Sequence, residues 1–318
     1  MPRSPGSKIT DPGRTIQTTG VPLIRDLPTL PLPPDGREEA TATFPSCRTP
    51  ASVSPRVKPI LFQFGNLSLH SFGVLVALGF LSGLWIASRN ARRLGLSGDV
   101  VYDLAPWLVI GGLVGARLLY VISYWNRDFA GQPFSEVFAI WKGGLVFYGG
   151  LIVATLAGLW RLYQLKLPVW TLADCLAPGV VVGHAFGRMG CLLNGCCFGR
   201  STIAPWAIHF PADHVTHGAP VHPTQIYEAG LNLIFFALLM AILRRRSFPG
   251  QVFCIYLVGY AVLRSTVEAF RGDYESLIPG STAFLTPGQR TSVLILSGGI
   301  VLYLWLKAKA TRSTPLRA

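Results

Sequence analysis

Residues 225–246 read QIYEAGLNLIFFALLMAILRRR. The stretch before the three arginines contains one charged residue, Glu228, and is long enough to cross the hydrocarbon core of a bilayer, which takes about 20 helical residues. A charge near the centre of such a helix costs about 2.5–3.5 kcal/mol on insertion scales, so it normally faces a polar cavity or an ion partner. The stretch therefore indicates a membrane-spanning helix that carries a functional group.

The whole chain has the composition of a multi-span membrane protein. Half of its 318 residues are hydrophobic, only 14% are charged, and the mean hydropathy is +0.43, whereas a soluble domain carries about 25% charged residues. The net charge of +13 would suggest a nucleic-acid ligand in a soluble protein, but the basic residues lie mostly in short clusters between apolar runs. We therefore expect no nucleic-acid partner and attribute the charge to membrane topology.

Seven apolar windows of membrane length predict the architecture. Alternate loops between them hold twelve lysines and arginines on one side and four on the other. The positive-inside rule then places the N-terminus outside and the C-terminus in the cytoplasm. The prediction is an all-α integral membrane protein with about seven transmembrane helices. The windows are residues 70–88, 101–123, 143–160, 171–193, 225–243, 251–269 and 288–306.

The chain divides into three predicted parts. Residues 1–58 are rich in Pro, Thr, Ser and Arg, lack the apolar run of a signal peptide, and are expected to be a disordered basic extension. Residues 59–308 are expected to form a seven-span transmembrane domain, and residues 309–318 a short basic cytoplasmic tail. The cations of the extension conflict with an outside N-terminus, so we expect translation to start later than Met1.

Charged residues also occur in other predicted spans, as Arg117, Arg188, Arg264 and Glu268. Arg264 and Glu268 are four residues apart, hence on one helical face and within pairing distance. Arg188 lies in GRMGCLLNGCCFGR (187–200), whose glycines break the helix near the interface. Backbone N–H groups freed there suit an anion such as a phosphodiester. Two arginines against one nearby acid would leave positive charge for such a ligand.

Structural explanations compete with this interpretation. A Gly-rich segment can be a helix-packing seam in which Arg188 extends to the lipid head groups, and Arg264 with Glu268 can be an ion pair with no further role. A metal site is a third alternative. It is disfavoured because structural zinc sites use Cys-x2-Cys pairs, and the candidate ligands here lack that spacing, so we expect no metal and no cofactor. The candidate ligands are His184, Cys191, Cys196 and Cys197.

Two further motifs open predicted spans. WKGGLVFYGG (141–150) places glycine pairs on either side of an aromatic segment that contains Tyr148, an arrangement that brings backbone close to a ligand. An aromatic-belt anchor is the alternative for Tyr148. HPTQIYE (222–228) has the composition of a helix start, with Thr224 as the expected cap. Capping does not explain Glu228 in the same motif.

These motifs, in this order along roughly residues 60–308, resemble the prolipoprotein diacylglyceryl transferase family. The resemblance implies transfer of the sn-1,2-diacylglyceryl group from phosphatidylglycerol to the lipobox cysteine thiol of prolipoproteins, with release of glycerol phosphate, in the bacterial inner membrane. It implies three partners, namely phosphatidylglycerol, prolipoprotein signal peptides and the lipid bilayer. The matching pieces are GARLLY (115–120), GGLVFYGG (143–150), residues 187–200, 222–228 and 258–271, and PGQ (287–289).

The resemblance also implies roles for individual residues. Arg188 and Arg264 match arginines that serve the phosphodiester, and Glu268 would orient Arg264. Phosphatidylglycerol binding is expected from Arg188, Arg264, Asn194, Gly195, His222, Gln225 and Glu228. Catalytic roles are expected for Arg264, Glu268, Tyr148 and His184.

The chain departs from the family pattern at three positions. Tyr148 stands where members carry His, Phe72 stands where they carry Tyr, and Cys191 stands where Asn is often found. Because a phenol ionises near pH 10, the general base is either Tyr148, with its pKa lowered by the arginines, or His184. His184 lies one turn before Arg188 on the same helical face.

A multi-span transporter of an anionic solute is the alternative function. Such a protein would also bury Arg and Glu and break its helices. Transporters usually contain internal repeats, however, and the two halves of this sequence show no self-similarity. We therefore expect an enzyme.

Overall fold

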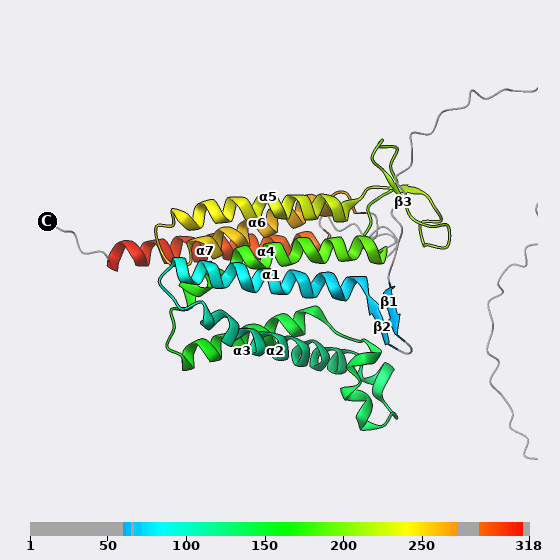
Figure 1. The fold of residues 1–318 in the computed structure, drawn as a ribbon, viewed down its shortest axis with the longest axis horizontal. Coiled ribbons are helices and arrows are strands. Elements are labelled where there is room, and N and C mark those ends of the chain that lie inside the picture. Colours follow the sequence, from blue (N-terminus) through cyan, green and yellow to red (C-terminus); the bar gives the residue numbers. More distant parts are fainter. Residues whose placement is uncertain (1–59, 65–66, 272–285, 314–318) are drawn as a thin grey trace, which may run out of the picture. The chain divides into compact units, whose positions relative to one another are not determined.

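The structure is a computed structural model that describes residues 60–64, 67–271 and 286–313. The predicted disorder of residues 1–58 and the end of the predicted tail lie outside the described residues. Within them the chain forms seven α-helices, one in each apolar window (Figure 1). The helices are α1 (Ser71–Arg93), α2 (Asp99–Ser123), α3 (Phe147–Gln164), α4 (Val169–Asn194), α5 (Thr224–Arg244), α6 (Gln251–Glu268) and α7 (Pro287–Ser313).

Helix lengths confirm a mostly helical, multi-pass membrane protein. Among the described residues, five helices are long and apolar enough to cross a membrane, namely α1, α2, α4, α5 and α7. The other two, α3 and α6, have 18 residues each, about 27 Å at 1.5 Å per residue, against a hydrocarbon core of about 30 Å. The last helix continues to Ser313, so it includes the first half of the predicted tail.

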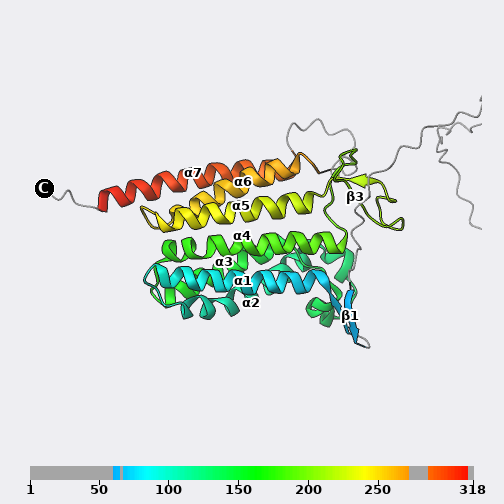
Figure 2. The ribbon, with the colours of Figure 1, turned by 45° about the horizontal axis from the view of Figure 1, so that its top comes forward.

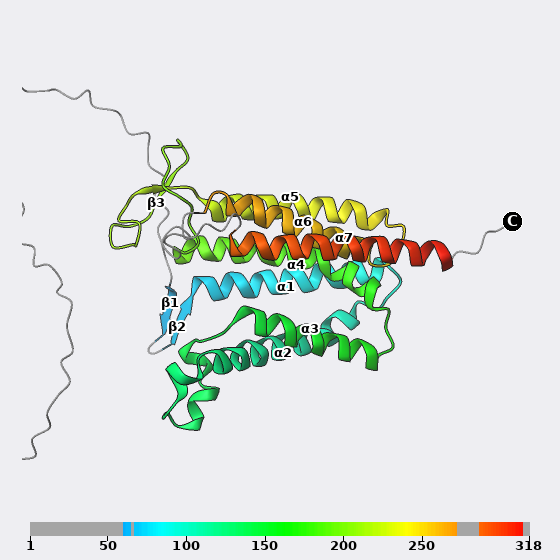
Figure 3. The ribbon, with the colours of Figure 1, turned by 180° about the vertical axis from the view of Figure 1, so that it is seen from behind.

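The helices lie side by side in three groups. Helices α1 and α4 pack together in the centre, α2 and α3 pair on one flank, and α5, α6 and α7 form the other flank (Figure 2). The view from behind shows α7 running alongside α6 (Figure 3). The core positions of this arrangement are filled by small and aliphatic side chains such as Ala91, Leu172 and Leu239.

Glycines allow α1 and α4 to approach closely. Gly79 and Gly83 on α1 face Gly183 and Gly179 on α4. A Cβ atom at Gly83 would lie 2.9 Å from the carbonyl oxygen of Gly179, and one at Gly79 would lie 3.0 Å from that of Gly183. Small residues four apart are the usual means of helix association in lipid, where the hydrophobic effect between helices is absent.

Two short β-hairpins lie at one end of the bundle, and the C-terminal end of α7 lies at the other (Figure 1). Because the helices alternate in direction, the ends of α2, α4 and α6 meet the starts of α3, α5 and α7 at the strand-bearing end. This is the end that holds the predicted site. The strands are β1 (Ile60–Phe64), β2 (Leu67–His70), β3 (Ile208–His209) and β4 (Pro220–Val221), and short helical turns span Trp125–Phe129, Phe134–Phe138 and Ile140–Lys142.

A buried carboxylate holds the opposite end together. Asp174 on α4 is fully buried and accepts hydrogen bonds from the backbone N–H groups of Gly250 (2.8 Å) and Phe253 (2.9 Å). Its Oδ2 also lies 2.9 Å from Nη1 of Arg246. These N–H groups belong to the first turn of α6, which has no partner for them within the helix. Asp174 therefore caps α6 from a neighbouring helix, a role that the sequence analysis did not assign.

We predict that Asp174→Asn destabilises the protein by about 3 kcal/mol, because removing one partner leaves the other charge of a buried pair uncompensated. Thermal unfolding in detergent measures the change. The matched control is Asp103→Asn, whose pair with Arg161 (2.9 Å) is partly exposed, so its loss should change the stability much less. Equal losses in both variants would contradict the capping role.

Candidate functional site

Three side chains from α4 and α5 form an ion cluster at the strand-bearing end. The Glu228 side chain, in the second turn of α5, is only 5% exposed. Its Oε2 lies 2.9 Å from Nε of Arg188, and its Oε1 lies 3.1 Å from Nε2 of His184. His184 and Arg188 are four residues apart on α4, so they share one face of the helix and reach the same carboxylate.

The position of one proton decides how this cluster is connected. Nε of Arg188 also lies 3.2 Å from Nε2 of His184, but a neutral imidazole nitrogen either donates or accepts. Because the Nε–H of Arg188 is directed at Nε2, this nitrogen is the acceptor, and Nδ1 carries the proton of the neutral ring. Arg188 and Glu228 form an ion pair at 2.9 Å. Oε1 of Glu228, 3.1 Å from Nε2, would stabilise the ring once Nε2 is protonated as well.

A second ion pair joins α6 to the start of α7. Nη2 of Arg264 lies 2.8 Å from Oε2 of Glu268, four residues later, which confirms the predicted pair. Glu268 is buried, and its Oε1 accepts a 3.1 Å hydrogen bond from the hydroxyl of Thr286. The carboxylate is therefore fixed from two helices.

Helix α7 begins with a capping box at TPGQ (286–289). The N–H of Gln289 donates to the Thr286 hydroxyl (3.2 Å), and the N–H of Thr286 donates to the Gln289 side-chain oxygen (3.1 Å). A Cβ atom at Gly288 would lie 2.6 Å from Oε1 of Glu268. Glycine therefore lets the carboxylate sit against the first turn of α7, where the helix dipole favours negative charge.

Both arginines act on the same buried groups. Glu228 lies within electrostatic range of Arg188 and Arg264, and Tyr260 on α6 lies within range of both arginines. The structure thus brings together two guanidinium groups predicted from separate spans. The interpretation that they face one acid is wrong, because Arg188 pairs with Glu228 while Arg264 pairs with Glu268.

Tyr260 is a member of this cluster that the sequence analysis missed. The ring of His184 lies 6.0 Å from the ring of Tyr260, and Tyr148, in the first turn of α3, lies within electrostatic range of the same residue. Tyr148 itself is 57% exposed and packs edge-on against Phe147. Both candidate bases therefore border Tyr260. Its position four residues before Arg264, on the same helical face, is the signal that could have identified it.

Arg117 has a different role from the other buried charges. Its side chain lies beside the rings of Tyr120 and Phe129 and donates only to backbone carbonyls in the loop before α3. A guanidinium with this many donors can hold a loop without a carboxylate partner. Arg117 therefore positions the loop that leads to Tyr148. The acceptors are the carbonyl oxygens of Val137 (2.8 Å), Glu136 (2.7 Å), Gly143 (2.7 Å) and Gly144 (3.1 Å).

The second glycine pair of residues 143–150 contacts a helix. A Cβ atom at Gly150 would lie 2.8 Å from the carbonyl oxygen of Gly112, and one at Gly149 would collide with Gly115. These glycines therefore let α3 pack on α2, which differs from the predicted close approach to a ligand.

The Gly-rich end of α4 does not offer the backbone donors predicted for an anion. Helix α4 ends at Asn194, and Gly195 adopts the left-handed conformation (φ 74°). The N–H groups of Gly195 and Cys196 donate to the carbonyls of Leu192 and Cys191. A helix C-terminus presents carbonyl groups, and its dipole favours cations. The prediction that this segment frees backbone N–H groups for an anion therefore fails at Gly195 and Cys196, because both groups donate to carbonyls at the end of the helix.

The start of α5 holds the loop after α4. Nε2 of Gln225 donates to the carbonyl of Cys196 (2.7 Å), and the hydroxyl of Thr224 donates to that of Cys197 (2.7 Å). The predicted cap is wrong, because Pro223 occupies the N-cap position and Thr224 is the first helical residue. The two polar side chains instead join α5 to the end of α4.

The remaining predicted residues make contacts of their own at the strand-bearing end. Nδ1 of His222 lies 3.1 Å from the Tyr227 hydroxyl, and Asn194 is exposed at the end of α4. Phe72 packs on α4, where a Cβ atom at Gly190 would lie 3.0 Å from its ring.

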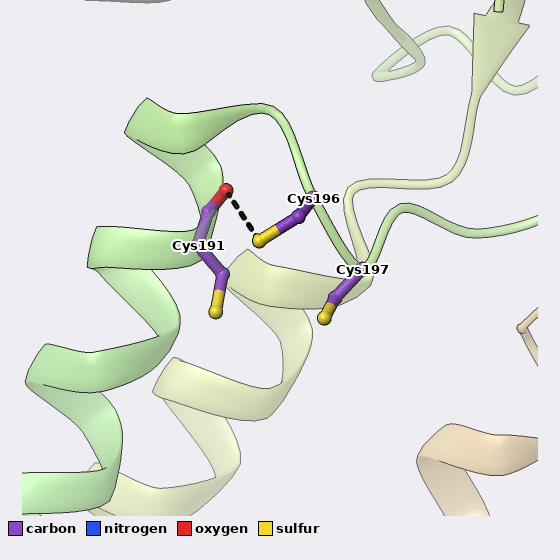
Figure 4. Close-up of side chains that lie close together, drawn as sticks. All are labelled: Cys191, Cys196 and Cys197. Carbon is purple, nitrogen blue, oxygen red and sulfur yellow. Dashed lines mark hydrogen bonds between the residues drawn. The ribbon is translucent and has the colours of Figure 1, made fainter. Parts of the chain in front are cut away.

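Three cysteines come together beside the last turn of α4. Their side chains converge from the helix and from the following loop (Figure 4). Each sulfur lies within 4.8 Å of the other two. These residues, Cys191, Cys196 and Cys197, are the group of possible metal ligands that the described residues contain.

Comparison with known proteins identifies the family of this chain. The family described as prolipoprotein diacylglyceryl transferase matches residues 59–305. Three relatives carry the name phosphatidylglycerol–prolipoprotein diacylglyceryl transferase. The one from Synechococcus elongatus is 35% identical over 258 residues, which cover 78% of this chain and 87% of the relative.

The other two relatives give the same result. The protein from Geobacter sulfurreducens is 38% identical over 224 residues, which cover 68% of this chain and 83% of the relative. The protein from Parasynechococcus marenigrum is 37% identical over 265 residues, which cover 79% and 94%. The match of the family over most of the described residues confirms the resemblance found in the motifs. The chain belongs to the prolipoprotein diacylglyceryl transferase family.

Proposed function

We propose that this chain transfers the sn-1,2-diacylglyceryl group of phosphatidylglycerol to the lipobox cysteine of a prolipoprotein. The thiol sulfur forms a bond to the glyceryl carbon, the bond from that carbon to the phosphate oxygen breaks, and glycerol phosphate leaves. The thiol proton passes to a base. The reaction needs a thiolate, a cradle for the phosphodiester and stabilisation of charge on the leaving phosphate.

The unused donors of Arg188 are the observation that carries this proposal. Arg188 contacts Glu228 and His184 through Nε alone. Its two Nη groups make no hydrogen bond within the described part of the chain, although only 16% of the side chain is exposed. A guanidinium edge held in this way can bind two phosphate oxygens at once. Arg264 supplies the second positive charge from α6.

His184 is the proposed general base. Nε2 would accept the thiol proton, and the buried carboxylate of Glu228, 3.1 Å from that nitrogen, would stabilise the imidazolium that forms. Tyr148 is largely exposed on α3, where it would border the acyl chains or the signal peptide. The proposal therefore gives Glu228 two functions, since it orients both Arg188 and His184.

The remaining predicted residues form the rim in this proposal. Asn194, Gly195 and His222 lie where the glycerol head group would meet water, and Gln225 supports the loop behind them. Glu268 fixes the direction of the Arg264 guanidinium. No cofactor takes part in the proposed reaction.

The proposed topology has seven spans in the bacterial inner membrane, with the strand-bearing end outside. The last turns of α1, α3, α5 and α7 carry arginines at the opposite end, which supports a cytoplasmic location for that end. The two 18-residue helices are proposed to cross as partners of longer ones. An anion transporter is not favoured, because the family and the named relatives are transferases.

The test of the proposed function is mass spectrometry of a lipobox peptide incubated with the purified protein and phosphatidylglycerol. We expect the peptide to gain one diacylglyceryl group on its cysteine. An unmodified peptide, together with solute flux in liposomes that contain the protein, would contradict the proposal.

We predict that Arg264→Lys lowers the rate of lipidation by about ten- to a hundredfold, because Lys offers a point charge where Arg offers two parallel donors. The same peptide assay measures the rate. Arg161→Lys is the matched control, since Arg161 pairs with Asp103 on the surface of α2 and α3. Full turnover by Arg264→Lys would refute the phosphate role.

We predict that His184→Gln lowers the rate of lipidation by about a hundredfold or more, because a positioned general base typically contributes about 10²–10⁴-fold. Tyr148→Phe should lose less than about tenfold, because Tyr148 is largely exposed on α3. Rates of peptide lipidation compare the two variants. The reverse result would assign the base to Tyr148, and near-native activity in both would reject each.

We predict that Gly288→Ala lowers activity by at least about tenfold. The added methyl group would collide with Glu268 and displace the Arg264 guanidinium, and misplacement of a positioned group by about 1 Å can cost a hundredfold. Gly298→Ala, on the same helix, meets no atom within 4 Å and should retain full activity. Equal activities would show that Glu268 does not depend on the start of α7.

A further inference from the structure

We propose that Cys191, Cys196 and Cys197 bind a thiophilic metal ion of the Zn²⁺ or Cu⁺ class. The proposal goes beyond the transferase reaction, which uses none of these sulfurs. It also departs from the expectation drawn from spacing, since Cys-x4-Cys-Cys lacks the Cys-x2-Cys pair of structural zinc sites. The three-dimensional arrangement supplies what the spacing alone does not (Figure 4).

The backbone around the cluster turns the three sulfurs toward one another. Cys191 lies in the last turn of α4, and Gly195 reverses the chain in the left-handed conformation. Cys197 also adopts a positive φ of 60°, which is unfavourable for a residue with a Cβ atom. The hydrogen bonds from Thr224 and Gln225 to the carbonyls of residues 196 and 197 hold this loop in place. The convergence is therefore fixed by packing on α5.

The distances fit a metal ion after a small adjustment. Zinc–sulfur bonds of about 2.3 Å in a tetrahedral site place sulfurs about 3.8 Å apart. The three sulfurs already lie within 4.8 Å of one another, and each of the three residues is partly accessible to solvent. Side-chain rotations that move each sulfur by less than about 1 Å would bring all three sulfurs to the Zn–S bonding distance.

The surroundings balance the charge of such a complex. Each thiol would release its proton to solvent, and three thiolates around a divalent ion would carry a net charge of −1, or −2 around Cu⁺. Arg188 and Arg271 both lie within electrostatic range of Cys197. These two positive charges would offset the net negative charge of the metal–thiolate complex.

A fourth donor is available next to the cluster. Gln225 is buried, and its Oε1 has no hydrogen-bond partner within the described part of the chain, while its Nε2 contacts Cys196. This oxygen or a water molecule would complete a four-coordinate Zn²⁺ site, whereas Cu⁺ would need no fourth ligand. Thiolate ligands select these soft cations over Mg²⁺ and Ca²⁺.

The experiment measures metal binding by the full-length protein in detergent, purified without a polyhistidine tag. All variants carry Cys47→Ser, because residue 47 lies outside the described residues. Zn²⁺ and Cu⁺ are titrated separately and bound metal is determined by elemental analysis, while Co²⁺ reports thiolate coordination through its visible absorption. We expect one equivalent of Zn²⁺ or Cu⁺ per chain and a thiolate-to-cobalt band.

Two sets of substitutions test the location. The triple variant should abolish stoichiometric binding; it combines Cys191→Ser, Cys196→Ser and Cys197→Ser. The single variant Cys196→Ser keeps the test decisive if the triple variant does not fold, and it should weaken binding by at least about tenfold. Cys175→Ser with Cys254→Ser is the matched control, because these two thiols are buried elsewhere, and it should bind like the parent. Peptide lipidation by the metal-free protein is measured separately, so failure of the transferase proposal would be recognised independently.

Three results would overturn the inference. The first is the absence of stoichiometric binding for Zn²⁺, Co²⁺ and Cu⁺ alike. The second is binding that survives in the folded cluster variants. The third is a disulfide between two of the three cysteines in the protein as isolated, detected as a mass 2 Da below that of the reduced protein, which would show that the sulfurs serve as a redox pair.

Discussion

The structure depends on the cost of placing a charge in an apolar environment. A charged side chain within a lipid-spanning helix needs a partner inside the protein. Glu228 receives Arg188 and His184 from α4, and Glu268 joins α6 to the start of α7. The pair of Arg188 with Glu228 links α4 to α5, and the hydrogen bond from Thr286 to Glu268 links the start of α7 to α6, so these contacts help to align the helices at the strand-bearing end. The arginines whose charge must be neutralised inside the membrane are therefore the same arginines that are proposed to bind the phosphodiester.

Much of the fold follows from local sequence signals. Each apolar window of membrane length contains a helix, since length and hydropathy are properties of a single segment. The pairing of α1 with α4 could not be predicted, because the glycines that face each other are about a hundred residues apart. The capping role of Asp174 could not be predicted for a similar reason. It depends on contacts with Gly250 and Phe253, which lie more than 70 residues away in the sequence.

The candidate site divides in the same way. Pairs four residues apart on one helix, such as Arg264 with Glu268, are visible in the sequence and occur in the structure. The pairing of Arg188 with Glu228 across two helices is not visible, and overlooking it led to the wrong count of acids. Glycine density after Arg188 correctly marks the end of the helix, but it does not show how the backbone is bonded there. The N–H groups of Gly195 and Cys196 donate to carbonyls of Leu192 and Cys191, so these two groups do not serve an anion.

The contact of Glu268 with Thr286 and Gly288 has a consequence for the biosynthesis of the protein. Helix α7 is synthesised after α6, and the carboxylate that orients Arg264 gains its hydrogen bond to Thr286 only when the start of α7 has reached its place. A nascent chain that holds α1 to α6 in the membrane would orient Arg264 without this support. The proposed lipid site is therefore completed only after α7 has docked on α6.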